Sequence, residues 1–334
     1  MNHIEGKNGK LITGKKLKQE SLQVLCVFAL LLVLCIFFSF TSPYFNKSTN
    51  YLNMLRQISV AALLACGMNF VLLVGHIDLS IGSTVAVTGV IAAEVSALTN
   101  NITVTIITVL LGGALVGIIN GLLIVTFKIP SFIATLAMMS ILRGGVLVFT
   151  NAKTIFGLKP QLLAFGQGYL GPIPIPVLMM VGIFIIAFIV LTKTKFGLHI
   201  YAVGGNAEVA RLSGVNVKRI LITVYVICGV LAAIAGLVTT ARTAAATPVA
   251  GAGYELDAIT AVVLGGTSMS GGSGSLIGTF LGVAVLGVLS NGLTMLNINV
   301  FWVQIIKGII LLVAIIVSVR ATDKEKIKKR RKQL

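Results

Sequence analysis

Residues 258–306 read AITAVVLGGTSMSGGSGSLIGTFLGVAVLGVLSNGLTMLNINVFWVQII and carry no charged side chain over 49 consecutive positions. A helix that crosses the hydrocarbon core of a membrane needs about 20 apolar residues, because the core offers no water to hydrogen-bond an open backbone. This stretch is therefore long enough for two crossings. Residues 21–46 are also free of charge, and further apolar runs recur between the two stretches. The pattern predicts a protein with many transmembrane helices.

The overall composition excludes the other common classes of protein. Of 334 residues, 57% are hydrophobic and 10% are charged, and the mean hydropathy is +1.03. A soluble domain carries about 25% charged residues, so this chain cannot cover a water-soluble globule of its size. The four cysteines show no C-x-x-C spacing, which argues against a zinc site or a redox motif. No motif of an enzyme active site is present, and we expect no enzymatic activity.

We expect an all-α fold with about ten transmembrane helices, separated by Asn, Gly, Pro and isolated charges. The expected spans are 22–40, 51–75, 80–98, 103–127, 131–151, 173–192, 218–241, 254–270, 274–297 and 300–319. The first is interpreted as an uncleaved helix, because its apolar run is too long for a signal peptide. An eight-helix arrangement with one re-entrant segment is the main alternative.

The net charge of +17 predicts the topology. Residues 1–20 hold five Lys against two Glu, and residues 320–334 hold eight Lys or Arg against two acids. We therefore expect a basic N-terminal tail (1–20), a transmembrane domain (21–319) and a basic C-terminal tail (320–334), with both tails in the cytoplasm beside anionic lipids. Six expected helices precede the basic loop 193–217, which places that loop in the cytoplasm too. No aromatic residues alternate with the tail charges, so nucleic acid is not an expected partner.

Two short segments indicate an internal repeat. Gly117-Ile-Ile-Asn120-Gly121-Leu122 resembles Gly287-Val-Leu-Ser-Asn291-Gly292-Leu293, with one insertion. The first lies in the fourth expected helix and the second in the ninth, so the two halves would have opposite orientations. Inverted repeats of this kind are typical of transporters, whose pathway lies between the halves.

Polar side chains within the apolar spans are candidates for a solute pathway, because a buried charge costs at least ~2.5–3.5 kcal/mol on insertion scales. The pathway candidates are Asn69, Asp78, Glu94, Asn120, Arg143, Thr267 and Asn291. Arg242 is a further charge at membrane depth. Glu255 and Asp257 stand at the start of an expected helix, where the helix dipole favours acids, so we interpret them as structural. Lys307 lies near a helix end, where its long side chain can reach the interface.

Six sequence blocks carry a resemblance to a known family. They are Gly75-His-Ile-Asp78-Leu-Ser80-Ile-Gly82-Ser83, Phe132-Ile-Ala-Thr135-Leu with Leu142-Arg143-Gly144, Tyr201-Ala-Val-Gly204-Gly205-Asn206, Ala210-Arg211-Leu212-Ser213-Gly214-Val-Asn216, Gly253-Tyr254-Glu255-Leu256-Asp257-Ala258-Ile259 and Gly265-Gly266-Thr267-Ser268-Met-Ser-Gly271-Gly272. With these blocks in this order, residues 22–319 resemble the permease subunits of bacterial ATP-binding cassette (ABC) importers for monosaccharides. The pattern is most similar to ribose permeases. His76 departs from the usual second Gly, and Ser273 from the usual Lys or Arg.

The resemblance implies a bacterial plasma-membrane permease that works as a homodimer. It further implies two ATP-binding cassette modules, which hold ATP and Mg²⁺, and an extracytoplasmic sugar-binding protein. This chain itself would bind no cofactor. A coupling helix in loop 193–217 would dock on the ATPase, and its expected residues are Asn206, Glu208, Arg211, Leu212, Ser213 and Gly214.

Two other functions stay open at this level. An ion-coupled secondary sugar carrier would use Asp78, Glu94 or Glu255 as a titrating group and would need no ATPase. The third hypothesis is a channel or scaffold protein that carries out no energised transport. The sequence pattern favours the ABC permease, with ribose as the expected monosaccharide.

Overall fold

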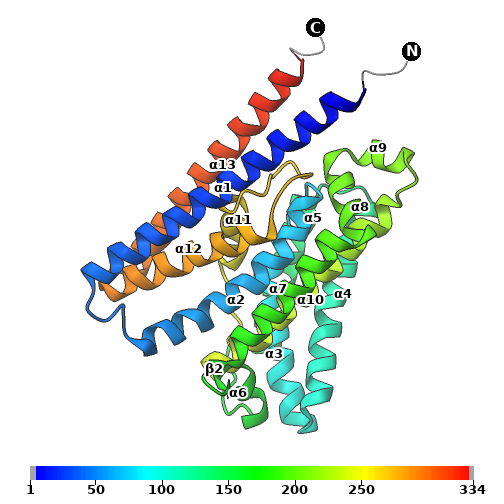
Figure 1. Ribbon diagram of the computed structural model, residues 1–334. Helices are drawn as coiled ribbons and strands as arrows, with labels where there is room; N and C mark the ends of the chain where they lie inside the picture. The colour runs from blue at the N-terminus through cyan, green and yellow to red at the C-terminus, as the bar shows by residue number, and fades with distance from the viewer. Residues whose placement is uncertain (1–4, 331–334) are drawn as a thin grey trace.

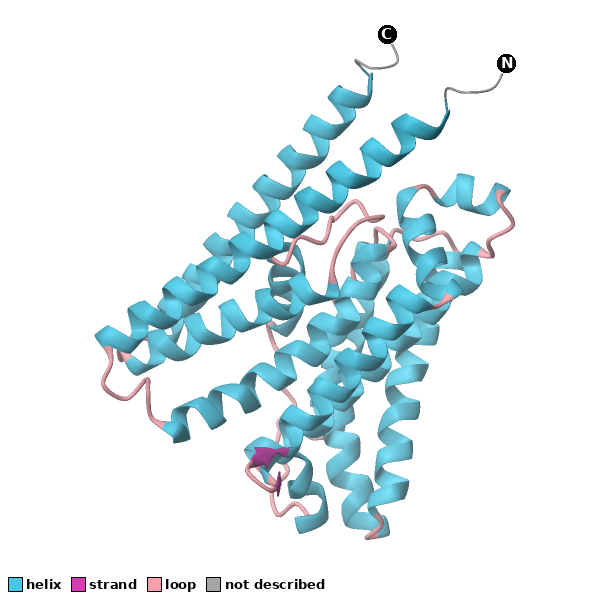
Figure 2. Ribbon diagram, viewed as in Figure 1, coloured by secondary structure: helices cyan, strands magenta, loops and turns pink. Residues whose placement is uncertain are grey.

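The computed structural model describes the backbone of residues 5–330 and the side chains of residues 23–316. The two predicted basic tails, 1–20 and 320–334, therefore lie outside the described side chains. Helices make up nearly all of the regular secondary structure in the described chain, and β1 and β2 form a small antiparallel pair (Figure 2). The all-α fold class is confirmed.

The elements follow one another along the chain as shown in Figure 1. Their bounds are α1 (Glu5–Thr41), α2 (Ser48–Leu73), α3 (Ile81–Thr99), α4 (Ile102–Thr126), α5 (Ser131–Phe149), α6 (Pro160–Gln167), β1 (Tyr169–Leu170), β2 (Ile173–Pro174), α7 (Ile175–Lys193), α8 (Lys195–Gly205), α9 (Ala207–Leu212), α10 (Val217–Thr243), α11 (Tyr254–Leu264), α12 (Leu276–Met295) and α13 (Val300–Arg330). Every one of the ten expected spans has a helix at its position. Eight helices within the described residues are long and apolar enough to cross a membrane, and α13 adds the shorter apolar stretch 300–316.

The expected span 254–270 is wrong in its extent, because α11 has 11 residues and ends at Leu264. At 1.5 Å per residue it is about 16 Å long, half of a bilayer core. The helix stops at Gly265-Gly266, where Gly266 has a φ of +92° that favours glycine. The next expected helix likewise begins at Leu276 rather than at 274.

An irregular segment, 244–253, begins the pass that α11 completes. Its start lies beside α6, where the Gln167 side chain donates to the Arg242 carbonyl. The loop after α11 lies at the other end of the bundle, where Gly272 N–H donates to the Leu73 carbonyl at the end of α2. Arg143 of α5 donates from Nη1 to the carbonyls of Pro248 and Ala250, both at 2.8 Å. Irregular backbone at this depth is tolerated because protein groups satisfy its polar atoms.

The two halves of the chain show matching packing. In the first half α3 packs on α4 and α5, and in the second half α11 packs on α12 and α13. α10 lies on α3 and α4, whereas α2 lies on α11 and α12, so each half contributes its second membrane helix to the other. This exchange is the arrangement that an inverted repeat offset by five helices would produce.

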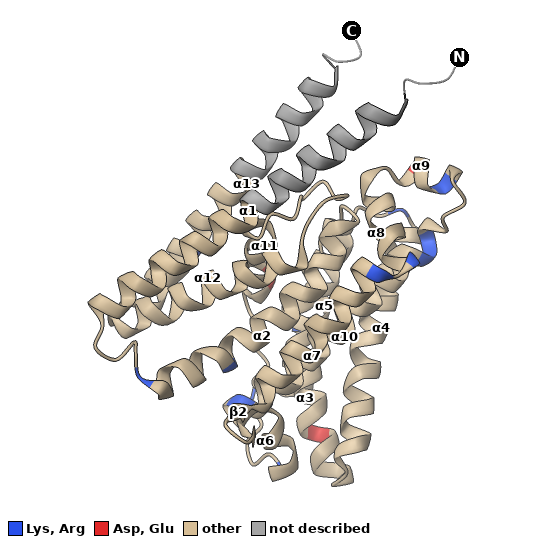
Figure 3. Cartoon of the chain, in the orientation of Figure 1, with Lys and Arg blue, Asp and Glu red and all other residues tan. Residues whose placement is uncertain are grey.

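The bundle has two distinct ends. The α9 end holds α8, α9 and loop 265–275, together with the first turns of α1 and the last turns of α13, and the α6 end holds α6, β1 and β2 (Figure 1). Basic residues gather around α8, α9 and the start of α10, as Figure 3 shows. A cluster of positive charge at one end of a membrane protein is typical of its cytoplasmic side.

Candidate functional site

The short helix α9 is an exposed, well-capped turn. The Asn206 side chain accepts hydrogen bonds from the backbone N–H groups of Glu208 and Val209, both at 3.0 Å, and so caps the helix. At the other end Gly214 has a φ of +87°, and its N–H donates to the Arg211 carbonyl. Ser213 Oγ donates to the Val209 carbonyl at 2.9 Å. The helix is therefore held by its own residues.

α9 presents both charge and apolar surface to the outside. Arg211 donates to both carboxylate oxygens of Glu208, at 2.6 and 3.0 Å. These hydrogen bonds hold the pKa of the Glu208 carboxyl below its ordinary value and raise that of Arg211. Leu212 is 73% exposed and Val209 is 57% exposed. An exposed apolar residue beside an oriented ion pair is a surface suited to a protein partner.

α8 connects this turn to the membrane helices through close backbone contacts. A Cβ added at Gly204 would meet the Leu73 carbonyl oxygen at the end of α2 and would lie 2.5 Å from Gly272 N. Tyr201 Oη donates to the Gly274 carbonyl at 3.1 Å. A displacement of α9 and α8 therefore acts directly on the end of α2 and on the loop between α11 and α12.

Four of the predicted pathway residues take part in three buried contacts between segments that are distant in the sequence. Thr267 Oγ1 donates to Asn69 Oδ1 at 3.0 Å, and both side chains are buried. Asn291 and Asn50 exchange two hydrogen bonds, at 2.8 and 3.0 Å, between α12 and α2. Asn120 of α4 donates to Ser80 Oγ at 2.8 Å. These amides bridge neighbouring helices.

Asp78 belongs to the same buried network as Asn120. The Ser80 N–H and Oγ–H donate to Asp78 Oδ1 at 2.9 and 2.6 Å, so the Asp78 side chain closes a turn that leads into α3. Arg143 is committed to the carbonyls of the irregular segment 244–253. Glu94 is half-buried on α3 and has no polar partner among the described residues. The seven predicted pathway side chains are thus spread over several contacts rather than gathered in one site.

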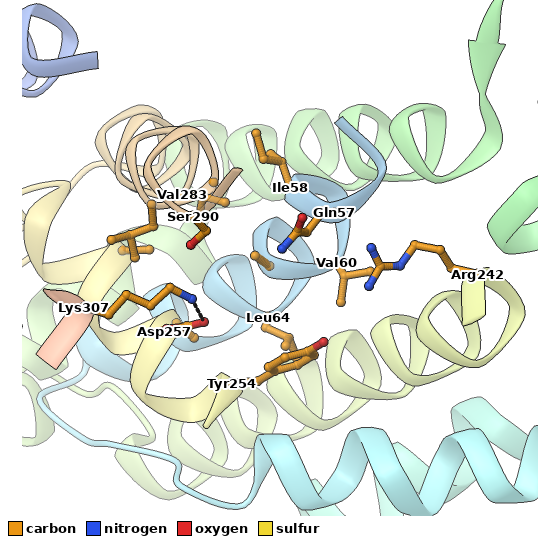
Figure 4. Close-up of a pocket in the computed structure, with 15 residues that line it drawn as sticks. Gln57, Ile58, Val60, Leu64, Arg242, Tyr254, Asp257, Val283, Ser290 and Lys307 are labelled. Atoms are coloured by element: carbon orange, nitrogen blue, oxygen red, sulfur yellow. Dashed lines mark hydrogen bonds and ion pairs between the residues drawn. The ribbon is translucent and has the colours of Figure 1, made fainter. Parts of the chain in front are cut away.

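A cavity of about 70 Å³ lies among α2, α10, α11, α12 and α13, and Figure 4 shows its lining. Its polar lining residues are Gln57, Arg242, Tyr254, Asp257, Ser290 and Lys307. Because one water occupies at least 10–15 Å³ by this measure, the cavity holds roughly five waters. None of the seven predicted pathway residues lines it. Sequence reasoning singled out the charges of Arg242, Asp257 and Lys307 but did not predict that they line one cavity.

The cavity contains an ion pair between two helices. Lys307 Nζ of α13 lies 2.7 Å from Asp257 Oδ2 of α11, and the two side chains are 24% and 32% exposed. Arg242 Nε is buried without a hydrogen-bond partner in the described structure. Glu255, by contrast, points back to the helix start, where its Oε1 accepts from Gly253 N–H at 3.2 Å. Asp257 is therefore both a first-turn acid, as expected, and a part of the cavity wall.

Comparison with known proteins gives consistent matches over most of the chain. Residues 50–315 match the family model described as branched-chain amino acid transport system / permease component. The ribose import permease protein RbsC of Escherichia coli (strain K12) is 43% identical over 292 residues, covering 86% of this chain and 91% of that protein. RbsC of Bacillus subtilis (strain 168) is 43% identical over 299 residues, covering 89% and 93%. The xylose transport system permease protein XylH of Haemophilus influenzae is 34% identical over 363 residues, covering 90% and 97%. No solved structure matches the chain significantly.

Proposed function

The chain belongs to the permease family that includes these ribose and xylose permeases, and on that premise we propose that it is the transmembrane subunit of an ABC importer that passes ribose inward. The observation that supports this most strongly is the 43% identity with RbsC proteins of two distant bacteria over nearly their whole length. A sugar has many hydroxyl groups and no charge, so a pathway for it needs hydrogen-bond partners rather than a fixed ion site.

In this proposal α9 is the coupling helix. Leu212 inserts into an apolar surface of the partner ATPase, and the Glu208–Arg211 ion pair sets the orientation of docking. Gly204 lies against the end of α2 and against Gly272, so closure of the ATPase subunits on ATP moves both contacts together. The conformation of α9 is maintained by the capping and turn residues Asn206, Ser213 and Gly214.

The partners follow from the same proposal. Two copies of this permease span the bacterial plasma membrane, with both termini and the α9 end in the cytoplasm beside anionic lipids. Two ATP-binding modules dock at that end and hold the ATP and Mg²⁺, while this chain binds no cofactor. An extracytoplasmic sugar-binding protein delivers ribose to the α6 end.

Reconstituted transport tests the proposal. Vesicles containing the permease and its ATPase, with ATP at the α9 side and ribose with its binding protein at the other, should accumulate ribose, and a protonophore should not stop it. Accumulation by the permease alone that a protonophore abolishes would establish the ion-coupled carrier instead. The family relationship does not favour that alternative.

Two variants test the coupling role. Arg211→Glu should reverse the charge beside Glu208, and Gly214→Val should strain a turn that has a φ of +87°. Both should uncouple ATP hydrolysis from uptake while leaving the helices folded. Lys218→Glu, an exposed charge reversal on α10, is the matched control. Receptor-stimulated ATPase and uptake that stay normal in both variants would refute the assignment of α9.

A further inference from the structure

The cavity among α2, α10, α11, α12 and α13 has the chemistry of a polyhydroxyl site. Asp257 supplies acceptor oxygens, Lys307 and Arg242 supply N–H donors, and Gln57 and Ser290 supply both. Tyr254 adds a flat ring that carries a polar tip. Figure 4 shows these side chains pointing toward one another from different helices. Acceptors and donors around one small cavity match hydroxyl groups, each of which donates and accepts.

The cavity extends into the bundle from its surface, because the lining residue Gln57 is exposed whereas others, such as Val283, are buried. Gln57 is nine residues from the first residue of α2, Ser290 is five residues from the last of α12, and Lys307 is seven residues from the first of α13. At 1.5 Å per residue these positions are about 8–14 Å inside the α6 end of the helices. A solute that enters from that end reaches the cavity before it has crossed half of the bundle.

Structural needs alone do not explain the charges in the wall. Ionisable residues at membrane depth are unfavourable, and they mark pathways and pairs far more often than simple packing. Asp257 could cap α11 without any partner, yet it pairs with Lys307 of α13, and Arg242 Nε has no hydrogen-bond partner in the described part of the chain. The unfilled donor and the part-exposed pair are groups that a bound polar molecule can satisfy.

We propose that this cavity is a transit site for an uncharged polyhydroxylated solute, with the Asp257–Lys307 pair as its specificity-determining element. The proposal rests on the function proposed above and identifies where in the protomer the sugar is held. Hydroxyl groups hydrogen-bond to Asp257 and Lys307 from the cavity side, and Arg242 and Gln57 bind the opposite edge of the solute. Hydrogen bonds to ionised groups are stronger than those between neutral groups. The Asp257–Lys307 pair therefore discriminates most strongly between solutes whose hydroxyl groups are oriented differently.

The pair also links solute binding to helix position. Asp257 is in the first turn of the short helix α11, and α11 leads directly into loop 265–275, which contacts α8 through Gly272. Lys307 is on α13, in the same half of the repeat. A solute that weakens the 2.7 Å contact between them therefore frees α11 relative to α13.

The first experiment measures ATP-driven ribose uptake in vesicles that contain the complete complex. Asp257→Asn and Gln57→Leu should each raise the sugar concentration for half-maximal uptake, Asp257→Asn by about tenfold or more, because one charge-assisted hydrogen bond is lost. Receptor-stimulated ATP hydrolysis should stay close to normal. Lys153→Gln, which removes an exposed charge in the loop after α5 that does not line the cavity, is the matched control and should leave uptake unchanged. Gln57 is exposed, so its variant should fold even if the Asp257 variant does not.

The second experiment measures solute binding at the cavity independently of transport. Ser290→Cys, in a chain whose four native cysteines are replaced by Ala, should react with a small thiol reagent, and ribose should slow that reaction. Normal uptake by the wild-type complex, with unchanged half-maximal concentrations in the variants and no protection of Ser290→Cys, would overturn the cavity assignment alone. Protection without any ATP-driven uptake would support the site and refute the proposed function.

Discussion

Replacing Gly204 with alanine should break the contact that joins the coupling turn to the membrane helices. The added Cβ would meet the Leu73 carbonyl oxygen and would lie 2.5 Å from Gly272 N and 2.9 Å from the Leu73 carbonyl carbon. Ordinary contact begins at 3.4 Å, so α8 must move by about 0.5–0.9 Å or more. The same shift strains the hydrogen bond from Gly272 N–H to the Leu73 carbonyl, now 2.9 Å long.

We expect Gly204→Ala to lower the free energy of unfolding by about 1–3 kcal/mol, which is the usual cost of overpacking. That range corresponds to a roughly 5- to 150-fold smaller ratio of folded to unfolded protein. Gly205→Ala is a matched control, because a Cβ there meets nothing within 4 Å. Both changes replace glycine near the end of the same helix, so they share any gain in helix propensity, and the difference between them isolates the steric effect.

The assay compares the two variants in detergent and in vesicles. Heat-dependent loss of the monodisperse species should occur at a lower temperature for Gly204→Ala than for Gly205→Ala. Uptake per ATP hydrolysed should also fall for Gly204→Ala. If the two variants match each other in thermal stability and in uptake per ATP, the reasoning that α8 transmits movement through this contact is refuted.

Three further outcomes are expected from other contacts. Gly117→Ala should destabilise the chain by about 1–3 kcal/mol, measured by denaturant unfolding, because the new Cβ would lie 2.7 Å from backbone atoms of α10. Asn291→Leu should cost about 1–3 kcal/mol by leaving Asn50 buried without its partner, and the double Leu variant should recover part of that loss. The Glu208–Arg211 pair should make coupled ATPase activity insensitive to pH from about 5.5 to 8, because a carboxyl with a lowered folded pKa loses its contribution only as pH falls through that pKa. A fall in coupling between pH 7 and 6 would contradict the last expectation.

The position of each apolar segment could be predicted from the sequence. Every one of the ten expected spans has a helix at its position, with α5 (Ser131–Phe149) and α7 (Ile175–Lys193) within two residues of the expected bounds at each end. Membrane helices satisfy their own backbone hydrogen bonds, so local hydropathy and length suffice to locate them. The length of α11 was overestimated for the same reason. The run 254–270 carries no charge after Asp257, and the helix ends only at the backbone of Gly265-Gly266.

The partners of polar side chains could not be predicted. Asp257 was expected to act at a helix start and Lys307 to reach the interface, yet the two are paired across 50 positions of sequence. Asn291 was expected in the pathway, yet it is hydrogen-bonded to Asn50, 241 positions away. The two side chains of each pair come from two different helices, so the contact depends on how those helices cross.

For this protein, hydropathy, charge and motif order determined that the chain is an all-α membrane permease with an exposed basic loop, because those properties act segment by segment. Tertiary packing alone decided that α2 and α10 exchange places between the halves, that residues 244–253 replace half of a helix, and that the charges of α11 and α13 face one cavity. The physical reason is that a lipid-exposed segment is selected by its own composition, whereas a polar group inside the bundle is stabilised only by what a distant helix brings to it.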